Sequence, residues 1–383
     1  MKIAVLKERA LGEQRVAISP EMVKKLVSHG VEVIIEQGAG EHSSISDEEY
    51  VQAGAKVSKV LLEIVADADV VLKVQPSPSL ESSNEEDLSE LAFIRPGTAL
   101  IGLLSPYNNK ELLETYASKK ITSVAMELVP RITKAQSMDV LSSQSNLAGY
   151  MAVIRAANDL GRAFPMMMTA AGTISPARVL VMGAGVAGLQ AIATAKRLGA
   201  IVSAFDVRSA AKEQVESLGA NFIEVPAEEE GSTSAGYAKE MSEEYKLKQK
   251  QLIHDTIKKS DVVITTALIP GKPAPQLISL EMVKDMRAGS VIIDLAAANG
   301  GNCEGMVADK TILYNNVKII GYTNLPTALA ADASRLYSRN LYNFLEYVTN
   351  KEFKTIDINF DDEIIKACVL TNDGQVVHPN FKE

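Results

Sequence analysis

Three glycines and an aspartate in the middle of this sequence have the types and spacing of a phosphate-binding turn. Gly183, Gly185 and Gly188 form a G-x-G-x-x-G pattern, and Asp206 follows at about the twenty-residue distance that a dinucleotide fingerprint requires. The first glycine permits a tight turn, the second lets the backbone approach a pyrophosphate, and the third lets a helix pack closely on its strand. Asp206 would accept hydrogen bonds from a ribose diol and repel a 2′-phosphate. The pattern therefore favours NAD over NADP.

The residues around this pattern predict a strand, a tight turn, a helix and a second strand. The apolar run 179–182 precedes the glycines, helical periodicity follows from Leu189, and the apolar run 201–205 ends on Asp206. The N-terminus of such a helix offers free N–H groups and a partial positive charge, which stabilise a nearby anion by about 0.3–1 kcal/mol. Arg208 leaves an alternative open, because it could receive a 2′-phosphate or be an ordinary solvated charge.

Length and composition describe a globular protein with two domains. The chain has 383 residues, more than a single hydrophobic core usually serves, so two domains are expected. Its 46% hydrophobic and 23% charged residues are typical of a globular protein. The net charge of −9 and the lack of a basic run with interleaved aromatics argue against binding to nucleic acid. The N-terminus has no secretory signal pattern, and two cysteines are too few for a disulfide framework or a metal cluster. We therefore expect no metal site.

Alternating strand and helix patterns predict an α/β fold with two Rossmann-like, doubly wound parallel-sheet domains and a cleft between them. In the N-terminal portion of the chain, strands are expected at 3–6, 31–35, 70–74, 99–104 and 122–126, and helices at 21–28, 59–66 and 110–118. In the portion that follows, further strands are expected at 221–225, 261–267, 290–295 and 317–322. A helix at 333–348 and a hairpin turning at 371–374 are expected to return to the first domain. The expected domains are thus 1–136 with 330–383, and 137–329.

The segment that enters the second domain, 130–161, is rich in polar side chains. Its apolar spacing predicts one long helix beginning near Gln136, with Asp139 in its first turn and Arg131 in the loop before it. Asp139 and Ser142 are three residues apart and would share one face of that helix. These side chains form a candidate site, and a connecting helix with an ordinary cap explains the same residues equally well.

A second anomalous segment, 227–251, opens as an acidic loop rich in glycine and serine and continues as a charged helix. Long loops in compact domains are usually functional or disordered. Tyr237, next to Gly236, is the kind of residue that a lid carries. A mobile lid over about 227–242 and a plain flexible loop both remain open.

Several long motifs occur in an order that resembles one known family. They are KERALGEQRVAISP, RITKAQSMDVLSSQ, GAGVAGLQAIATAKRLGA, GYAKEM, TTALIPGKPAP and DLAAANGGNC. Together they closely resemble the NAD(H)-binding component of proton-translocating nicotinamide nucleotide transhydrogenases, which is related to alanine dehydrogenase. The resemblance covers essentially the whole chain. Because the chain ends near Glu383 without a following membrane segment, it looks like the separate subunit of the three-chain bacterial arrangement.

The resemblance implies a set of residues around the bound NAD(H). They are Arg131, Gln136, Asp139 and Ser142 at the nicotinamide end, Gly185 and Val186 beside Gly183 and Gly188 at the pyrophosphate, Asp206, Val207 and Arg208 at the adenosine end, Gln249 and Leu268 elsewhere in the pocket, and Gly236 and Tyr237 closing over the nucleotide. The four residues at the nicotinamide end and Tyr237 are expected to act in the reaction.

The resemblance also implies partners and a location. It implies a homodimer that works with an NADP(H)-binding beta subunit and a membrane-spanning subunit, with proton translocation carried out by those other chains. The expected location is cytoplasmic, at the periphery of the inner membrane. The implied reaction is direct hydride transfer between NAD(H) on this chain and NADP(H) on the partner.

An alanine-type amino-acid dehydrogenase is the main alternative. Oxidising an amino acid releases a proton as well as a hydride, so that chemistry needs a positioned acid or base. In alanine dehydrogenases a Lys and a His do this work; Lys73 matches the Lys, but the His position falls at about Ser105. Hydride transfer between two nicotinamides needs oriented rings in a dry site rather than a base. A non-catalytic NAD-binding regulatory module is a second alternative.

Overall fold

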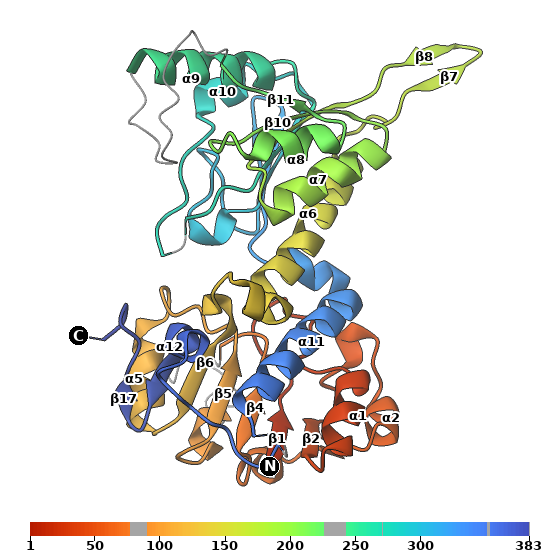
Figure 1. Cartoon of the computed structure of the whole chain (residues 1–383). Helices are drawn as coiled ribbons and strands as arrows, with labels where there is room; N and C mark the ends of the chain where they lie inside the picture. The colour runs from red at the N-terminus through yellow and green to blue at the C-terminus, as the bar shows by residue number, and fades with distance from the viewer. Residues whose placement is uncertain (77–89, 226–242, 270, 351–352, 383) are drawn as a thin grey trace. The chain divides into compact units, whose positions relative to one another are not determined.

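Two compact units make up the chain in a computed structural model, which describes residues 1–76, 90–225, 243–269, 271–350 and 353–382 (Figure 1). The first unit contains Met1–Gln144 and Pro326–Glu383, and the second contains Ser145–Leu325. The domain boundaries expected from sequence, after 136 and after 329, lie eight and four residues from this division. Each unit is built on its own sheet.

The first unit contains an eight-stranded sheet in the order β17-β16-β6-β5-β4-β1-β2-β3. Its strands are β1 Lys2–Val5, β2 Glu32–Glu36, β3 Lys56–Ser58, β4 Val70–Leu72, β5 Ala99–Gly102, β6 Thr122–Ala125, β16 Val369–Asn372 and β17 Gln375–Val376. The first six are parallel in the doubly wound order 3-2-1-4-5-6, and β16 and β17 add antiparallel strands at one edge. Strands β4 to β6 are buried at every residue, as expected for a parallel sheet covered on both faces.

Helices cover both faces of this sheet. They are α1 Pro20–Ser28, α2 Asp47–Gln52, α3 Leu61–Val65, α5 Lys110–Ser118, α11 Ala330–Val348 and α12 Glu363–Cys368, with short 3-10 turns η1 Glu41–Ser43, η2 Met126–Leu128, η3 Thr133–Met138 and η5 Leu325–Leu329. One core contains Ile3 and Val5 of β1 with apolar residues of α1 and α11, and the other contains Ala4 with residues of α3 and α5. Alternate residues of β1 thus point into opposite cores, as the two-residue period of a strand requires.

The second unit contains a seven-stranded sheet in the order β11-β10-β9-β12-β13-β15-β14. Its strands are β9 Arg178–Met182, β10 Ile201–Phe205, β11 Asn221–Phe222, β12 Val262–Thr265, β13 Val291–Asp294, β14 Thr311–Tyr314 and β15 Val317–Gly321, and its helices are α7 Val186–Arg197, α8 Ala211–Ser217, α9 Glu243–Ile257 and α10 Leu280–Lys284, with the turn η4 Ala297–Asn299. Its six parallel strands, numbered without β14, again follow the order 3-2-1-4-5-6, and β14 pairs antiparallel with β15 at the edge. Helices α7 and α8 lie on one core and α9 and α10 on the other.

Several details differ from the sequence-based expectation. The single long helix expected from Gln136 is wrong, because η3 ends at Met138 and a separate helix, α6 Val140–Asp159, follows Asp139. The short elements α2 and β3 were not expected. A hairpin of β7 Met167–Thr169 and β8 Gly172–Ile174, which projects from the second unit, was also missed (Figure 1). No helix within the described ranges has the length and apolar character that crossing a membrane requires.

Candidate functional site

The glycine turn of the second unit brings backbone very close to backbone. Gly183 has φ +103°, and a Cβ built on it would lie 2.5 Å from Thr266 Oγ1. A Cβ on Gly188 would lie 1.8 Å from the carbonyl oxygen of Gly183, so the first turn of α7 can cross the end of β9 only without a side chain there. A Cβ on Gly185 would meet nothing within 4 Å. The three glycines therefore have different roles: two permit close packing, and one leaves open space at the helix start.

The N-terminus of α7 has properties that suit an anion. Gly185 is its N-cap and supplies no side-chain cap, and Val186 begins the helix. The first N–H groups of a helix lack intrahelical partners, and the helix dipole adds a partial positive charge there. The open space beside Gly185 and the uncapped start of α7 can accommodate a pyrophosphate. The residues present therefore fit a dinucleotide.

Asp206 lies directly after β10, and its side chain is largely buried at 6% exposure. Its Oδ2 accepts a hydrogen bond from the Ala184 N–H at 2.7 Å, and Oδ1 accepts from the Arg208 N–H at 2.8 Å. The Arg208 guanidinium adds a two-pronged contact, with Nε 2.9 Å from Oδ1 and Nη2 2.9 Å from Oδ2. Burial alone would raise the pKa of Asp206, but these donors, Arg208 first, hold the pKa below its ordinary value. Asp206 is therefore ionised and ties the glycine turn to β10.

Two residues that sequence reasoning did not select, Asp294 and Asn302, shape the neighbouring loops at the carboxyl ends of β12 and β13. Asp294 is completely buried; Oδ2 accepts from the N–H groups of Asn302 at 2.6 Å and Cys303 at 2.9 Å. The side-chain amide of Asn302 bonds to both backbone groups of Ala267. Its Oδ1 accepts from the Ala267 N–H at 3.1 Å, and its Nδ2 donates to the Ala267 carbonyl at 2.9 Å. The motif DLAAANGGNC contains both residues, and the buried strand end before Asp294 was the signal that could have identified them.

Three of the four polar residues predicted in the first unit form one connected group. Asp139 Oδ1 accepts from the Ser142 N–H at 2.8 Å, Oδ2 accepts from the Ser142 hydroxyl at 2.6 Å, and Arg131 Nε lies 3.9 Å from Oδ2. Gln136 is exposed on η3 and completes the set. Asp139 thus caps the N-terminus of α6 instead of lying in its first turn. The same carboxylate is both a helix cap and a member of the polar cluster.

The remaining predicted residues are distributed over the second unit. Val207 and Leu268 are exposed, at 72% and 53%, and Gln249 lies half-buried on α9. Gly236 and Tyr237, with the proposed lid, lie outside the described residues.

Lys73, which matches the lysine expected in an alanine dehydrogenase, is fully buried between carboxylates. Its Nζ lies 2.9 Å from Glu90 Oε1 and 3.8 Å from Glu8 Oε2. Burial would lower the pKa of Lys73, but these carboxylates outweigh it and raise the pKa. Burial raises the pKa of Glu8 to about 7.

Ser105, at about the position of the dehydrogenase histidine, is held by its backbone. It adopts φ +47°, and its N–H donates to Glu127 Oε1 at 2.5 Å. The four histidines lie elsewhere: His29 and His42 are exposed, His254 is half-buried beside Asp285, and His378 is buried.

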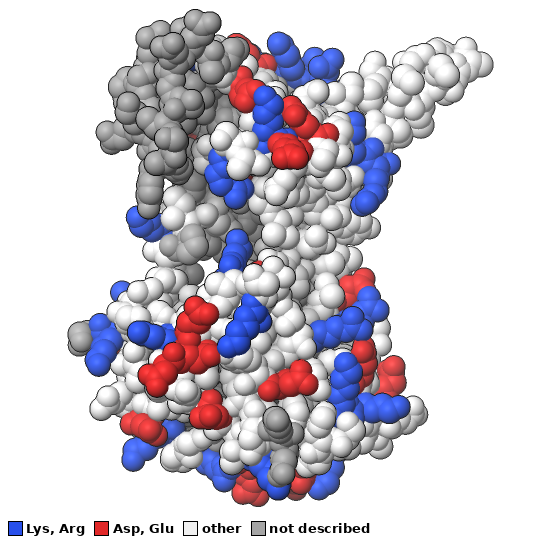
Figure 2. Space-filling view, in the orientation of Figure 1, with Lys and Arg blue, Asp and Glu red and all other residues white. Residues whose placement is uncertain are grey.

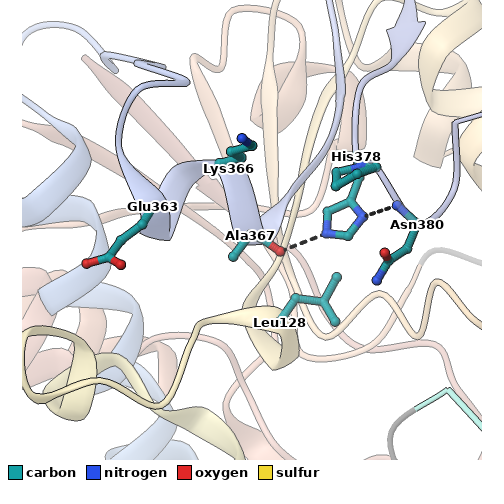
Figure 3. A pocket seen from close by; sticks show the side chains of 7 residues that line it. Leu128, Glu363, Lys366, Ala367, His378 and Asn380 are labelled. Atoms are coloured by element: carbon teal, nitrogen blue, oxygen red, sulfur yellow. Dashed lines mark hydrogen bonds between the residues drawn. The ribbon is translucent and has the colours of Figure 1, made fainter.

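A surface cavity of about 400 Å³ in the first unit is lined by none of the site residues predicted from the sequence (Figure 3). Leu128, Lys366 and His378 are among the residues that line it. His378 Nε2 bonds to the Ala367 carbonyl at 3.0 Å, and Nδ1 accepts from the Asn380 N–H at 3.2 Å, as the dashed lines of Figure 3 show. Both ring nitrogens are occupied, so His378 anchors the C-terminal segment to α12 and is not available as a base at this cavity.

Two doubly wound α/β units, one with a glycine-rich βα turn, an uncapped helix start and a terminal acid, define a protein of the dinucleotide-binding class. Residues 4–148 match the family model for the alanine dehydrogenase/PNT N-terminal domain, and residues 152–379 match the model for its C-terminal domain. The chain belongs to the alanine dehydrogenase/PNT family.

Relatives from both branches of this family are similar over nearly the whole chain. The chain is 55% identical to an NAD(P) transhydrogenase subunit alpha of Rhodospirillum rubrum, over 99% of this chain and 98% of that one. It is 30% identical to an alanine dehydrogenase of Methanococcus maripaludis, over 92% and 89%. Among solved structures, a transhydrogenase from Sinorhizobium meliloti matches with TM-score 0.88 and 49% identity over 98% of this chain and 100% of that one. An L-alanine dehydrogenase matches with TM-score 0.81 and 26% identity over 100% and 98%.

Proposed function

We propose that this chain is the NAD(H)-binding subunit of a proton-translocating transhydrogenase, exchanging hydride with NADP(H) on a partner subunit: NADH + NADP+ ⇌ NAD+ + NADPH. One observation carries the proposal: identity is 55% to a transhydrogenase alpha subunit over 99% of the chain, against 30% to an alanine dehydrogenase. Proton translocation would take place in partner subunits.

In the second unit, the residues of the glycine turn would hold the cofactor. The N–H groups at Gly185 and Val186 would face the pyrophosphate, while Gly183 and Gly188 keep the turn tight enough for that approach. Asp206 would accept the ribose hydroxyls, with Val207 and Arg208 beside the adenosine. Gln249 and Leu268 would complete the pocket, and Gly236 and Tyr237 would close over it.

In the first unit, the side chains of Arg131, Gln136, Asp139 and Ser142 would contact the nicotinamide ring and its carboxamide. The bound nicotinamide supplies the carbon that gives or takes hydride. The task of the chain is then orientation and exclusion of water, because transfer between two rings releases no proton on this subunit. The two hydrogen bonds between Asp139 and Ser142 support a role in orientation, since they hold these two side chains in one arrangement.

The alanine dehydrogenase alternative lacks one of its two expected proton-transfer groups. Ser105 stands at about the position of the family's histidine, and the ammonium of Lys73 is paired with buried carboxylates. The relatives named alanine dehydrogenase are also the more distant ones.

A hydride-transfer assay tests the proposal. The purified chain is mixed with NADPH and an NAD analogue whose reduced form absorbs separately, with and without a recombinant NADP(H)-binding domain of a transhydrogenase. We expect transfer only when the partner domain is present. Turnover of pyruvate and ammonia with NADH by the chain alone would establish the dehydrogenase instead. NADH binding without turnover in either assay would favour a regulatory module.

A homodimer is part of the proposal, and the β7–β8 hairpin is its expected contact. An isolated two-stranded hairpin is marginally stable in water. This one exposes Met166, Met168 and Ile174 at 59%, 79% and 41%, and no charged residue occurs in 163–177 (Figure 2). Exposed apolar patches mark contact sites, and we propose that a second copy of the chain covers this one.

Replacing Met168 with Glu tests this contact. We expect the variant to sediment as a monomer at concentrations where the parent chain is a dimer. Leu62→Glu, at another exposed apolar site in the first unit (51% against 79% for Met168), is the control and should stay dimeric.

We further propose that the subunit lies at the cytoplasmic face of the inner membrane, held there by its partner subunits.

A further inference from the structure

The turn η3 carries Gln136 between Arg131 and Asp139, and one face of α11 holds it in place. Ala135 and Met138 of η3 are buried in the core of the first unit, at 0% and 4% exposure. These two apolar contacts fix one side of the turn. The other side, with Gln136 and Ser137, is exposed, so apolar packing does not fix its position.

Two asparagines of α11 supply those partners. Asn340 Nδ2 donates to the Ser137 carbonyl at 2.8 Å, and Asn343 Nδ2 donates to the same oxygen at 3.0 Å. One carbonyl oxygen thus accepts two side-chain amides through its two lone pairs. Asn340 and Asn343 are three residues apart on α11 and therefore lie on one face of the helix.

Tyr347 extends this face by another turn. Lys134, also on η3, donates from Nζ to the Tyr347 hydroxyl at 2.5 Å and lies 4.6 Å from the centre of its ring. The Tyr347 hydroxyl also bonds to Asp362. Asn340, Asn343 and Tyr347, at spacing i, i+3, i+7, form a polar stripe on α11. The stripe bonds to η3 at Ser137 and Lys134, which lie on either side of Gln136 in the chain.

The stripe is connected to the start of α6 as well. The Ser143 hydroxyl donates to Asn340 Oδ1 at 2.8 Å, which leaves Asn340 with both ends of its amide used. Ser143 follows Ser142, the residue that bonds to Asp139. Asn340 is 7% exposed, so its amide has little water to compete with these bonds.

We propose that Asn340 and Asn343 are positioning residues for the hydride-transfer reaction, acting by holding Gln136 and Asp139 at a fixed place and orientation. The inference rests on the proposed function, in which those two side chains contact the nicotinamide. Neither asparagine touches the cofactor in this view; each acts through the Ser137 carbonyl. Reactions that depend on the approach of two rings are sensitive to displacements of about 1 Å, which cost on the order of 100-fold in rate.

The test uses Asn343→Ala and Asn340→Leu in the full chain with its NADP(H)-binding partner. We expect hydride transfer to slow about tenfold for each variant, with unchanged thermal midpoint for Asn343→Ala and an NADH dissociation constant within about twofold of the parent, because the glycine turn is untouched. Glu346→Ala, an exposed change on the same helix outside the stripe, should leave all three quantities unchanged.

A double-mutant cycle separates positioning from general stability. In a Gln136→Ala background, Asn343→Ala should slow transfer much less than in the parent, because the side chain that it positions is gone. Full additivity, or a parent-like rate in Asn343→Ala, would overturn the positioning role. A parent chain that transfers no hydride would overturn the proposed function, and the catalytic role of the stripe with it. Hydrogen exchange at 133–139 would then report only whether the stripe orders η3.

Discussion

Asp206 makes as many hydrogen bonds as a carboxylate can accept, and three of the four come from Arg208. A ribose diol can bind to it only by taking the place of the guanidinium, whose side chain is 62% exposed. We expect Asp206→Ala to weaken NADH binding about 10- to 100-fold, the range for hydrogen bonds to a charged group. Arg208→Ala should bind NADH at least as tightly as the parent. Fluorescence titration measures both, and equal losses in the two variants would mean that the guanidinium itself holds the cofactor.

Gly185 and Gly188 differ in what an added methyl group would meet, and this difference separates binding from folding. Gly188→Ala places a carbon against the Gly183 carbonyl, so we expect it to destabilise the protein by about 1–3 kcal/mol or more. Gly185→Ala has open space and should leave the unfolding free energy unchanged. It should still weaken NADH binding, because the methyl group occupies the approach of the pyrophosphate. Denaturant unfolding and NADH titration check the pair, and a stable Gly188→Ala would contradict the packing role.

At the scale of elements, the junction of η3 and α6 combines a helix cap with a candidate site. Asp139→Ala removes the cap of α6 and should cost about 1 kcal/mol of stability. Asp139→Asn keeps an oxygen for the Ser142 N–H and an amide for its hydroxyl, so the thermal midpoint should stay near that of the parent. If the charge of Asp139 serves the reaction, hydride transfer in Asp139→Asn should nevertheless fall. Parent-like transfer in that variant would leave Asp139 as a cap alone.

The same junction shows where sequence patterns succeed and fail. The glycine turn was predictable because three glycines, two strands and a terminal acid lie within a single local stretch. The break between η3 and α6 was not, because helical spacing continues through Asp139 and only its side chain, turned back as a cap, ends one element and starts the next. The contacts of Asn340 and Asn343 join residues about 200 positions apart in the chain, and no local pattern encodes them. The hairpin β7–β8 lacks the usual turn residues and alternation.

At the scale of the whole molecule, the two units should respond differently to the cofactor. NAD(H) bound at the glycine turn, as proposed, would stabilise the folded second unit by about 2.7 kcal/mol when its free concentration is 100 times the dissociation constant. We expect hydrogen exchange to slow throughout the sheet of the second unit on adding NADH, with β9, β10 and β12 protected most. Asp206→Ala at the same NADH concentration should show a smaller effect. Protection confined to the first unit would contradict a cofactor site at the glycine turn.

The sheets themselves were predicted well, including the edge strands β11 and β17, but the edge strands β3 and β14 were not expected. Fully buried parallel strands such as β4, β5 and β13 have continuous apolar runs that are easy to recognise. Edge elements such as β3 and β14 are short and half-exposed, so little apolar patterning distinguishes them from loops.

The placement of α11 after the whole second unit has a consequence for how the protein is made. Tyr337, Leu341 and Phe344 fill the core against β1 and α1, and the Ser334 hydroxyl accepts a hydrogen bond from the Val16 N–H. During synthesis, the first 144 residues leave the ribosome without this helix, while residues 145–325 hold every strand of their own sheet. Domains fold as units as they emerge. The second unit can therefore complete its fold on the ribosome, whereas the half-built first unit must wait for α11 with an open apolar face, which is the stage at which a chaperone would bind.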